Sequence, residues 1–370
     1  MCVYFNIEFE EEFMEIPVIF NRLLIFDGSH ALHRSLSVPN NYEMITTTGI
    51  RTGGIYGTIR TIIKELKTYN YFPVVVFDGS LSKRRLEIYP NYKRTLDKQQ
   101  LNESLEQKTE EQLFEEQMRI QYNTQRNMLE ELLPAFGIPV VHLQDWEGDD
   151  IIYILTKMSS NSIVVSDDKD LLQLIRNDNT GKCRVRRAMR DEFWDIDTLK
   201  EKGLDINSFI ACKAIVGDAS DNIPSACFQV GEKTAPDLFK LYEDVCINKG
   251  LPYPTTEEEL SIRCKDVGIS KRKAYLNFNE NQFLTNVSLT NLAIIDDEIN
   301  QNILETIYQD VINNINNINE DLILKKFNEY QFNTLNDRDL LKTVSNLRKI
   351  LTETDETVPE INNSFRDSLF

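Results

Sequence analysis

Two acidic clusters, each beside an apolar run, most constrain what this chain can fold into. Residues 146–150 (Trp-Glu-Gly-Asp-Asp) precede residues 151–155, whose apolar side chains indicate the inward face of a helix. Residues 166–170 (Ser-Asp-Asp-Lys-Asp) follow residues 163–165, which indicate a short buried strand. In an open α/β sheet, strand ends and the starts of the next helices meet in the crevice outside the carboxyl ends of the strands. The sequence therefore predicts a strongly negative crevice.

Carboxylates gathered in this way favour bound cations. Like charges raise one another's pKa and cannot all stay ionised when partly desolvated, unless cations hold them. Hard oxygen ligands favour Mg²⁺ or Mn²⁺. For Asp149 and Asp150 an alternative is that they only complement the dipole at the start of a helix. Matching clusters elsewhere in the chain distinguish the two interpretations.

Two further strands end in a matching motif. Residues 23–26 are followed by Asp27 and a Gly-Ser pair, and residues 73–77 are followed by Asp78 and another Gly-Ser pair. A helix expected over about residues 54–69 joins them, and strand, helix and strand of this length imply a right-handed βαβ unit. Alone, each Asp-Gly pair would indicate a turn. Together they predict that the strand-end carboxylates share one edge of a parallel sheet.

The net charge of −18 would ordinarily argue against a nucleic-acid partner, because phosphate binding depends on cationic surface. The charge is unevenly placed, however. Residues 83–98 hold six basic and two acidic side chains, and residues 182–190 hold five basic side chains and no acidic one. Basic stretches beside an acidic pocket fit a polyanion that metal ions bridge to the protein.

The cellular setting follows from what the sequence lacks. No run approaches the ~18 apolar residues of a membrane span, and the N-terminus lacks the order of a secretory signal, so we expect a cytoplasmic protein. The six cysteines contain no C-x-x-C pair and are expected to be reduced, without a disulfide framework or a thiolate zinc site. The three histidines are too dispersed for a metal or acid/base cluster.

A polar, highly charged segment lies between the second and third strands, at about residues 82–136. Its early part has few apolar residues, which favours a mobile insertion over the active edge; the alternative is a solvated helical hairpin. We expect a helix over about residues 109–133 at its end, followed by a return to the sheet at residues 139–141.

A helix, a loop and a second helix follow the sheet. The first is expected over residues 208–216 and is ended by glycine, after which Asp218 and Asp221 form a fifth acidic site. A second helix starts near Gly231 and Lys233. Glycine allows a phosphate to approach free backbone N–H groups, and lysine can neutralise it. This arrangement suits contacts to a nucleic-acid backbone rather than to bases.

These acidic motifs, in this order and spacing over about residues 23–242, resemble those of the 5′→3′ exonuclease and flap endonuclease family. The segment 291–296 is similar to a C-terminal segment of the phage members, including the ribonuclease H of T-even phages. The resemblance implies a doubly wound, mostly parallel α/β core of PIN-like type with a helical arch, a helix-hairpin-helix region and a helical C-terminal part. It also implies a metal-dependent nuclease acting at 5′ ends, flaps and RNA primers during DNA replication or repair.

The resemblance assigns the family's site residues to matching positions in this sequence. Its first metal site falls on Asp27, Asp78, Glu147, Asp149 and Asp150, and its second on Asp168, Asp170, Asp218 and Asp221. Two ions, Mg²⁺ or Mn²⁺, about 4 Å apart would drive an in-line phosphodiester displacement. The resemblance assigns a catalytic contact with the scissile phosphate to Lys93 and one with a neighbouring phosphate to Arg85. The expected nucleic-acid contacts are Lys83, Arg84, Tyr92, Arg94, Gly231, Lys233 and Thr234.

Four features stay open or depart from the family pattern. Tyr92 could stack on a splayed base or pack against the protein. The family usually has Arg three residues after its lysine, where this chain has Leu96, so either Arg94 substitutes for that contact or the contact is absent. Residues 224–231 keep only the last glycine of the family's hairpin turn, which argues against a K⁺ ion there. Asp167 is extra to the pattern and receives no ligand role.

The resemblance also divides the chain. We expect an N-terminal extension over residues 1–21, a core over 22–205 with the arch at about 82–136, a helix-hairpin-helix region over 206–300 and a helical part with a flexible tail over 301–370. The expected partners of this monomer are DNA with a 5′ flap, gap or nick, RNA–DNA hybrid and a single-strand-binding protein. The final Leu369 and Phe370 resemble peptides that dock in a sliding clamp, unless they fold back onto the preceding helices.

Two other functions fit part of the pattern. A PIN-like ribonuclease acting on single-stranded RNA shares the acidic core but lacks the second pair of helices. A non-catalytic junction-binding protein would be expected to have lost some of the carboxylates, whereas every matched position here is acidic.

Overall fold

The computed structural model describes residues 16–93, 109–263, 269–315, 317–335 and 337–351. The chain forms two compact units. The sheet unit comprises residues 12–80, 102–198 and 295–370, and the helical unit comprises residues 1–11, 81–101 and 199–294. The segment predicted as an arch therefore divides between the units. Its central part, residues 94–108, and the expected N-terminal extension up to residue 15 lie outside the described residues.

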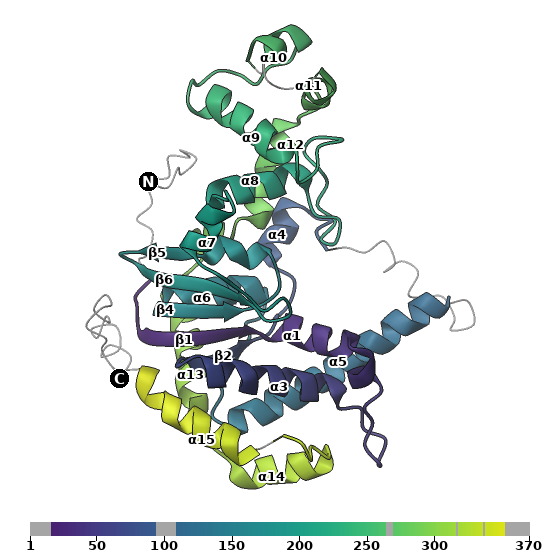
Figure 1. The fold of residues 1–370 in the computed structure, drawn as a ribbon, viewed down its shortest axis with the longest axis vertical. Coiled ribbons are helices and arrows are strands. Elements are labelled where there is room, and N and C mark those ends of the chain that lie inside the picture. The colour runs from purple at the N-terminus through teal and green to yellow at the C-terminus, as the bar shows by residue number, and fades with distance from the viewer. Residues whose placement is uncertain (1–15, 94–108, 264–268, 316, 336, 352–370) are drawn as a thin grey trace. The chain divides into compact units, whose positions relative to one another are not determined.

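Seven strands of the described residues form one sheet in the sheet unit (Figure 1). They are β1 (Phe20–Asp27), β2 (Phe72–Val76), β3 (Val140–Val141), β4 (Ser159–Val165), β5 (Arg176–Asp178), β6 (Gly181–Arg187) and β7 (Glu192–Trp194). The order is β3-β2-β1-β4-β6-β5, and β7 also pairs with β6. Strands β1, β2, β3, β4 and β6 run parallel, while β5 and β7 run antiparallel to β6. The expected mostly parallel sheet is confirmed.

The strand order reverses beside β1. From β1 the chain moves outward to β2 and β3, and it then returns to add β4 on the other side of β1. Right-handed crossovers in opposite directions place helices on both faces, which is the doubly wound arrangement. Every residue of β2 is buried, and β1 is buried at seven of its eight positions, as expected for strands covered on both faces. The topological switch point lies between β1 and β4.

The helices of the sheet unit follow this winding. They are α1 (Gly28–Ser37), α2 (Pro39–Tyr42), α3 (Gly53–Thr68), α5 (Glu110–Ala135), α6 (Gly148–Lys157), η3 (Asp170–Leu174), α13 (Gln301–Ile315), α14 (Glu320–Glu329), α15 (Asp337–Leu347) and η6 (Arg348–Leu351). Helices α1, α3 and α5 pack on one another, and α6 packs on β1, β2 and β4. Two short helices, α7 (Ile196–Glu201) and η5 (Leu292–Asp297), lie where the chain passes between units.

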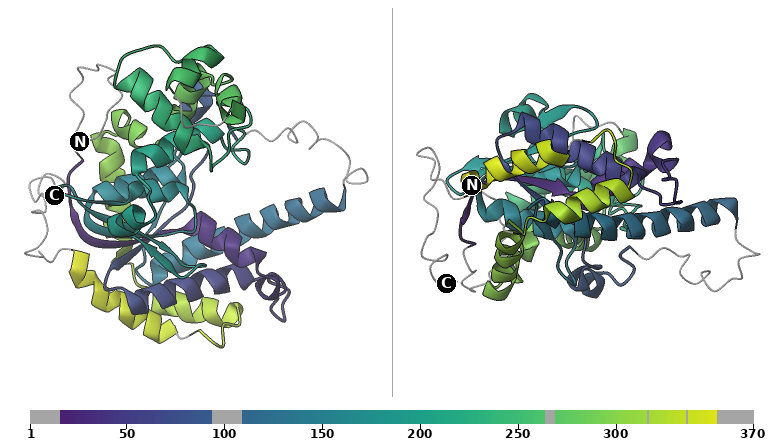
Figure 2. Two further views of the ribbon diagram at one scale, coloured as in Figure 1. Left: turned by 45° about the horizontal axis from the view of Figure 1, so that its top comes forward. Right: turned by 90° about the horizontal axis from the view of Figure 1, so that it is seen from below.

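The long helix α5 forms the later part of the predicted insertion (Figure 2). Its start is fixed by a capping box, in which the Thr109 side chain accepts from the Gln112 backbone and the Gln112 side chain accepts from the Thr109 backbone. Further along, the buried Gln125 accepts a hydrogen bond from Ile55 N at 3.1 Å. This contact joins α5 to the first turn of α3. The helix expected over about residues 109–133 is confirmed.

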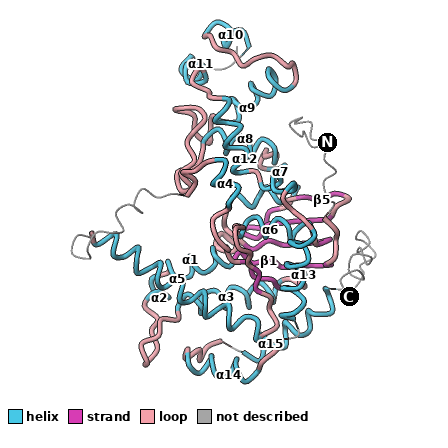
Figure 3. The backbone as a smooth tube through the Cα atoms, turned by 180° about the vertical axis from the view of Figure 1, so that it is seen from behind, coloured by secondary structure: helices cyan, strands magenta, loops and turns pink. Residues whose placement is uncertain are grey.

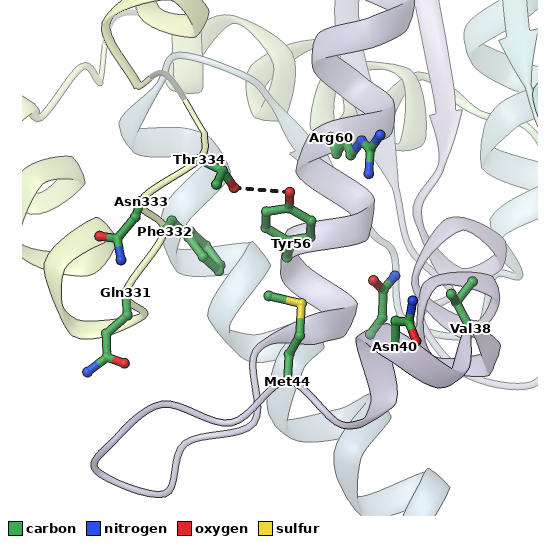
Figure 4. Close-up of a pocket in the computed structure, with 10 residues that line it drawn as sticks. Val38, Asn40, Met44, Tyr56, Arg60, Gln331, Phe332, Asn333 and Thr334 are labelled. Atoms are coloured by element: carbon green, nitrogen blue, oxygen red, sulfur yellow. Dashed lines mark hydrogen bonds between the residues drawn. The ribbon is translucent and has the colours of Figure 1, made fainter.

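The C-terminal helices are attached to α3 and to the loop before it. The Gln331 side chain accepts from Thr47 N at 3.2 Å and donates to Thr47 Oγ1 at 2.6 Å. Tyr56 and Thr334 share a hydrogen bond of 3.1 Å beside a pocket that includes Asn40 and Arg60 (Figure 4). These contacts hold the segment between α14 and α15 against the sheet unit.

The described part of the helical unit contains helices and loops only (Figure 3). Its helices are α4 (Lys83–Ile88), α8 (Ile206–Val216), α9 (Ala235–Tyr242), the π-helical turn η4 (Glu243–Ile247), α10 (Glu257–Arg263), α11 (Ile269–Tyr275) and α12 (Glu280–Thr290). The core gathers Ala214, Leu238, Tyr275 and Phe283. Gly217 ends α8 with φ +77°, a positive value that glycine adopts without steric cost. Across both units, none of the described helices is long and apolar enough to cross a membrane.

Candidate functional site

The acidic motifs of the sheet unit lie at one edge of its sheet. Asp27 is the last residue of β1, and Asp78 follows β2 by two residues. Glu147 is the residue before α6, which follows β3, and Asp168 lies just beyond β4. Because these four strands run parallel, their carboxyl ends share one edge. The structure therefore brings together the strand-end carboxylates that the sequence predicts.

Asp27 sits at the switch point, where both of its carboxylate oxygens are bound. Its Oδ1 accepts from His30 N at 2.9 Å, which caps α1, and its Oδ2 accepts from Ser166 Oγ at 2.8 Å. The following Gly28 allows α1 to start against β2, since a Cβ atom there would lie 2.8 Å from Val76 O. Asp27 is only 8% exposed. The carboxylate is thus fixed in place and largely shielded from water.

This environment disfavours the negative charge on Asp27. Burial raises the pKa of Asp27 to about 6, and the charge of Asp78 adds to the rise. Hydrogen bonds from His30 N and Ser166 Oγ act in the opposite direction but do not offset burial. A bound cation would relieve the same penalty, because it neutralises the carboxylate without a proton.

Asp78 holds the loop that leads to α6. Its Oδ1 accepts from Gly148 N at 2.7 Å, and its backbone N donates to Ser29 Oγ at 3.1 Å. The next residue must be glycine, since a Cβ atom on Gly79 would lie 1.5 Å from Leu143 O. The end of β2 and the start of α6 are therefore locked together, with the carboxylate of Asp78 between them.

Three acidic residues surround the start of α6, and they differ in accessibility. Glu147 is 6% exposed and Asp150 is 1% exposed, whereas Asp149 is half-buried. The Asp150 carboxylate accepts from Glu147 N at 3.2 Å and so caps the helix. Asp150 therefore stabilises the start of α6, whatever further role it has. Asp149 is the more accessible carboxylate of the pair.

Ser166 links the end of β4 to Asp27. Besides donating to Asp27, its hydroxyl accepts from Asp168 N at 3.1 Å. The Asp168 carboxylate in turn accepts from Asp170 N at 2.8 Å at the start of η3. Ser166 and Ser29 are the residues that the sequence analysis missed as parts of the site. The available signal was their position, because each is a small polar residue within two positions of a candidate ligand.

Hydrogen bonds from serine hydroxyls and backbone N–H groups hold the carboxylates in place, and the described carboxylates do not surround a common point. Within the described ranges, no three His, Cys, Asp or Glu side chains converge closely enough to form a metal site. The candidate groups of the sheet unit are nevertheless hard oxygen donors at one sheet edge, which suits Mg²⁺ or Mn²⁺.

The helical unit contains the remaining acidic residues. The Asp218 carboxylate accepts from Ser220 N at 2.9 Å and pairs with Lys213 Nζ at 3.1 Å. Burial raises the pKa of Asp218, but the Ser220 hydroxyl and the charge of Lys213 outweigh it, and the net pKa is below the usual value. Asp218 also pairs with Ile223 through two backbone hydrogen bonds of 2.9 and 2.7 Å. The loop after α8 is thus a closed, anionic turn.

Lys93 is held by the second acidic residue of this turn. Its backbone N donates to Asp221 O at 2.9 Å, and its Nζ lies 4.0 Å from Asp221 Oδ1. Lys93 has φ +49°, a conformation that non-glycine residues adopt only when their surroundings impose it. About a third of the side chain is exposed, at 33%. The ammonium group is therefore fixed but accessible.

Two residues of the candidate nucleic-acid contact are placed differently from the prediction. Tyr92 is 2% exposed and packs with Ile223 and Leu289, so the base-stacking interpretation is wrong and the packing alternative holds. Arg85 is 5% exposed, and its Nε donates to Leu289 O at 3.0 Å. The direct phosphate contact expected of Arg85 is not what the structure shows, because its side chain faces the core and ties α4 to α12.

The other predicted contacts lie on the surface of the helical unit. Lys83 is exposed, with its Nζ 3.9 Å from Glu87 Oε1, and Lys233 is also exposed. The N–H of Gly231 donates to Thr234 Oγ1 at 3.2 Å, so this turn already satisfies the donor that was expected to meet a phosphate. Arg84 is half-buried in α4. Arg94 lies outside the described residues.

Comparisons with known proteins agree with this arrangement. The doubly wound sheet, with carboxylates at its switch point, defines an α/β protein that has an acidic site at one edge of the sheet. The family description "5'-3' exonuclease, N-terminal resolvase-like domain" matches residues 22–203. The 5'-3' exonuclease of Aquifex aeolicus is 31% identical over 230 residues, which cover 60% of this chain and 70% of that protein. This chain belongs to the 5'-3' exonuclease family.

A longer relative matches over part of its length. DNA polymerase I of Caldicellulosiruptor bescii is 29% identical over 233 residues, 60% of this chain and 25% of the polymerase, so the chain spans about a quarter of that relative. Among solved structures, the T5 5'-exonuclease with divalent zinc ions bound has a TM-score of 0.58 and 22% identity, covering 80% of this chain and 100% of that one. A complex of the bacteriophage T5 flap endonuclease with DNA and metal ions has a TM-score of 0.56, 19% identity and coverage of 79% and 98%. These likenesses confirm the expected fold.

Proposed function

We propose that this chain is a structure-specific, divalent-metal-dependent 5′→3′ exonuclease and flap endonuclease. It would hydrolyse phosphodiesters at 5′ ends, flaps or RNA primers during DNA replication or repair. The observation that carries the proposal is the gathering of Asp27, Asp78, the start of α6 and Asp168 at one edge of the sheet, beside the switch point. Membership of the exonuclease family supports the same reaction.

The proposed cofactors are two Mg²⁺ or Mn²⁺ ions. The raised pKa of the buried Asp27 supports a cation beside it, and the solved T5 relatives hold metal ions. The proposed ligands are Asp27, Asp78, Glu147, Asp149 and Asp150 for one ion, and Asp168, Asp170, Asp218 and Asp221 for the other. When bound, such a pair supplies hydroxide at neutral pH and stabilises the leaving oxygen of the phosphodiester.

The chain's own residues would position these groups. Ser166 holds Asp27 and the backbone of Asp168 in one hydrogen-bonded chain, and Gly148 N orients the carboxylate of Asp78. Lys93 offers a fixed cation that can bind a phosphate oxygen as negative charge develops on it. Arg85 and Tyr92 act as positioning residues in this proposal, since they pack the segment that carries Lys93.

The proposed substrates are DNA with a 5′ flap, gap or nick and RNA–DNA hybrid. The exposed Lys83 and Lys233 are available to backbone phosphates, and the T5 flap endonuclease relative is solved with DNA. A single-strand-binding protein and a sliding clamp are the proposed protein partners. The clamp contact through Leu369 and Phe370 lies outside the described residues and stays a prediction.

One side-by-side assay separates this function from the alternatives. Cleavage of a 5′-labelled flap, an RNA–DNA hybrid and single-stranded RNA would be followed with Mg²⁺ and with a chelator. We expect Mg²⁺-dependent release of a short 5′ product from the flap and the hybrid. Cleavage of single-stranded RNA alone would favour the PIN-like ribonuclease. Tight flap binding without cleavage under any divalent ion would favour the non-catalytic junction-binding protein.

A further inference from the structure

Asp167 lies between the candidate ligands and a surface hairpin, and its carboxylate is occupied by the protein. Its two oxygens accept from Met189 N at 3.1 and 3.2 Å, and one of them pairs with Arg34 Nη1 at 3.3 Å. The Asp167 side chain is only 7% exposed. These contacts account for a carboxylate that the family pattern leaves without a role.

The hairpin that Asp167 holds is the connection from β6 to β7, whose tip is formed by residues 188–191. Strand β6 runs parallel to β4, so its end lies at the same sheet edge as the carboxylates. Asp167 holds the base of the tip as well, since Arg187 Nη2 donates to Asp167 O at 3.2 Å. Asp167 and the candidate ligand Asp168 are chain neighbours, about 3.8 Å apart between Cα atoms. The tip is therefore a rigid element at the rim of the site.

Part of the positive charge expected on this stretch is neutralised. Arg186 donates to Glu65 at 3.2 Å and Arg187 to Glu192 at 3.1 Å, while Arg184 donates to the uncharged Asn161 at 2.9 Å. The basic patch expected over residues 182–190 is thus smaller than the sequence suggests. Lys182 lies at the opposite end of β6.

Arg190 is different from these three arginines. It is exposed, and it has no hydrogen-bond or ion-pair partner among the described residues. Its neighbour Met189 is 59% exposed, an unusual value for a large apolar side chain. A cation and an apolar side chain thus project together from a tip whose backbone is already ordered. Little backbone entropy would be lost when they bind a ligand.

We propose that Met189 and Arg190 form an additional substrate contact at the rim of the site. Arg190 binds a backbone phosphate of the nucleic-acid strand, Met189 packs on the adjoining sugar or base, and Asp167 is the positioning residue that holds the tip. A site edged with carboxylates repels a polyanion, and one fixed cation beside it offsets part of that repulsion. This inference rests on the proposed nuclease function.

The first test compares Arg190→Ala with Arg60→Ala. Arg60 is a matched control, because it is exposed on α3 and also has no partner among the described residues. Single-turnover cleavage of a 5′-flap DNA would be measured with Mg²⁺ over a range of protein and KCl concentrations. We expect the half-saturating concentration of Arg190→Ala to rise about fivefold, the scale of one exposed charge pair, with the maximal rate unchanged.

The salt dependence gives a second readout of the same variants. Loss of one phosphate contact should reduce the slope of log affinity against log salt by about 0.7 to 0.9. Arg60→Ala should match the wild type in both measurements. If Arg190→Ala behaves like Arg60→Ala while the wild type cleaves the flap, the inference fails and the proposed function stands. If the wild type cleaves no substrate, it is the proposed function that fails.

The role of Asp167 is tested by substituting it in the wild type and in Arg190→Ala. Asp167→Ala should weaken half-saturation in the wild type and have a smaller effect in Arg190→Ala, because it acts through the tip and only the Met189 contact is left to lose there. Asp167→Asn, whose oxygen can still accept from Met189 N, should recover part of the loss and guards against a variant that fails to fold. A changed Mg²⁺ midpoint or a lower maximal rate in both backgrounds would make Asp167 a metal ligand and overturn its positioning role.

Discussion

Replacement of Asp27 by asparagine removes a buried negative charge and keeps the shape of the side chain. The amide oxygen can accept from His30 N, and the amide nitrogen can donate to Ser166 Oγ, so the first observed hydrogen bond is kept and the second is replaced by one of opposite direction. In the absence of metal ions, Asp27→Asn should therefore be more stable than the wild type at neutral pH. Such a gain in stability is expected because the folded protein alone, without a bound cation, does not stabilise the negative charge of Asp27.

The size of this effect follows from the raised pKa of Asp27. Burial raises that pKa from 3.8 to about 6, and each unit corresponds to about 1.4 kcal/mol, so the ionised carboxylate costs roughly 2 to 3 kcal/mol. Because the folded pKa lies above the unfolded one, the wild type loses this stability as the pH rises from about 4 to 6. Below pH 4 both states hold the proton, and the two proteins should differ little.

Denaturant unfolding of the two proteins between pH 4 and 8, with a chelator present, tests the reasoning. Both tryptophans, Trp146 and Trp194, belong to the sheet unit, so their fluorescence follows the relevant unfolding. Added Mg²⁺ should reverse the order of stability, because a ligand that binds the folded wild type more tightly stabilises it further.

A control substitution should give the opposite pH dependence. Hydrogen bonding from Thr198 N lowers the pKa of Asp195, so Asp195→Asn should lose stability near neutral pH and less at low pH. The reasoning about Asp27 would be refuted by a metal-free wild type that is more stable than Asp27→Asn at pH 7. A stability difference that does not change with pH would refute it equally.

Three further predictions concern the site. Asp149→Ala should abolish Mg²⁺-dependent cleavage while flap binding stays within several-fold in an anisotropy titration, and full activity would contradict a ligand role. Lys93→Ala should lower the single-turnover rate by about 10²-fold; a change in half-saturation alone would make Lys93 a binding residue. Gly79→Ala should lower the melting temperature, because its Cβ would lie 1.5 Å from a backbone carbonyl, whereas Gly231→Ala, with open space around it, should melt like the wild type.

The sheet edge could be predicted from sequence because each part of the signal is local. Apolar runs followed by Asp27 and Asp78 identify the strands and their ends within a few residues. The βαβ connection then fixes which ends share an edge. The first strand nevertheless starts at Phe20 rather than at Leu23, because Phe20 and Arg22 pair with β4 across a polar interruption in the sequence.

The misplaced residues have partners far away in the chain. Arg85 looks like a surface cation in its own segment, but it donates to Leu289 O, 204 residues later. Arg186 belongs to a basic run, yet its counter-ion Glu65 lies 121 residues earlier in α3. A sequence pattern over a few residues contains no information about such pairs, so charge runs predict surface cations that tertiary packing removes. Ser166 escaped notice for the same reason, since its partner Asp27 is 139 residues away.

The contact between Asp221 and the segment around Lys93 can form only after the ribosome has added Asp221. Tyr92 and Asp221 are 129 residues apart, and a ribosome adding about 5 to 20 residues per second needs roughly 6 to 26 s to pass from one to the other. During that interval the nascent chain contains Lys93 without the residue that fixes it. A chain whose synthesis stops before Asp221 would therefore contain the strand-end carboxylates of the sheet unit but would lack the residue that holds Lys93.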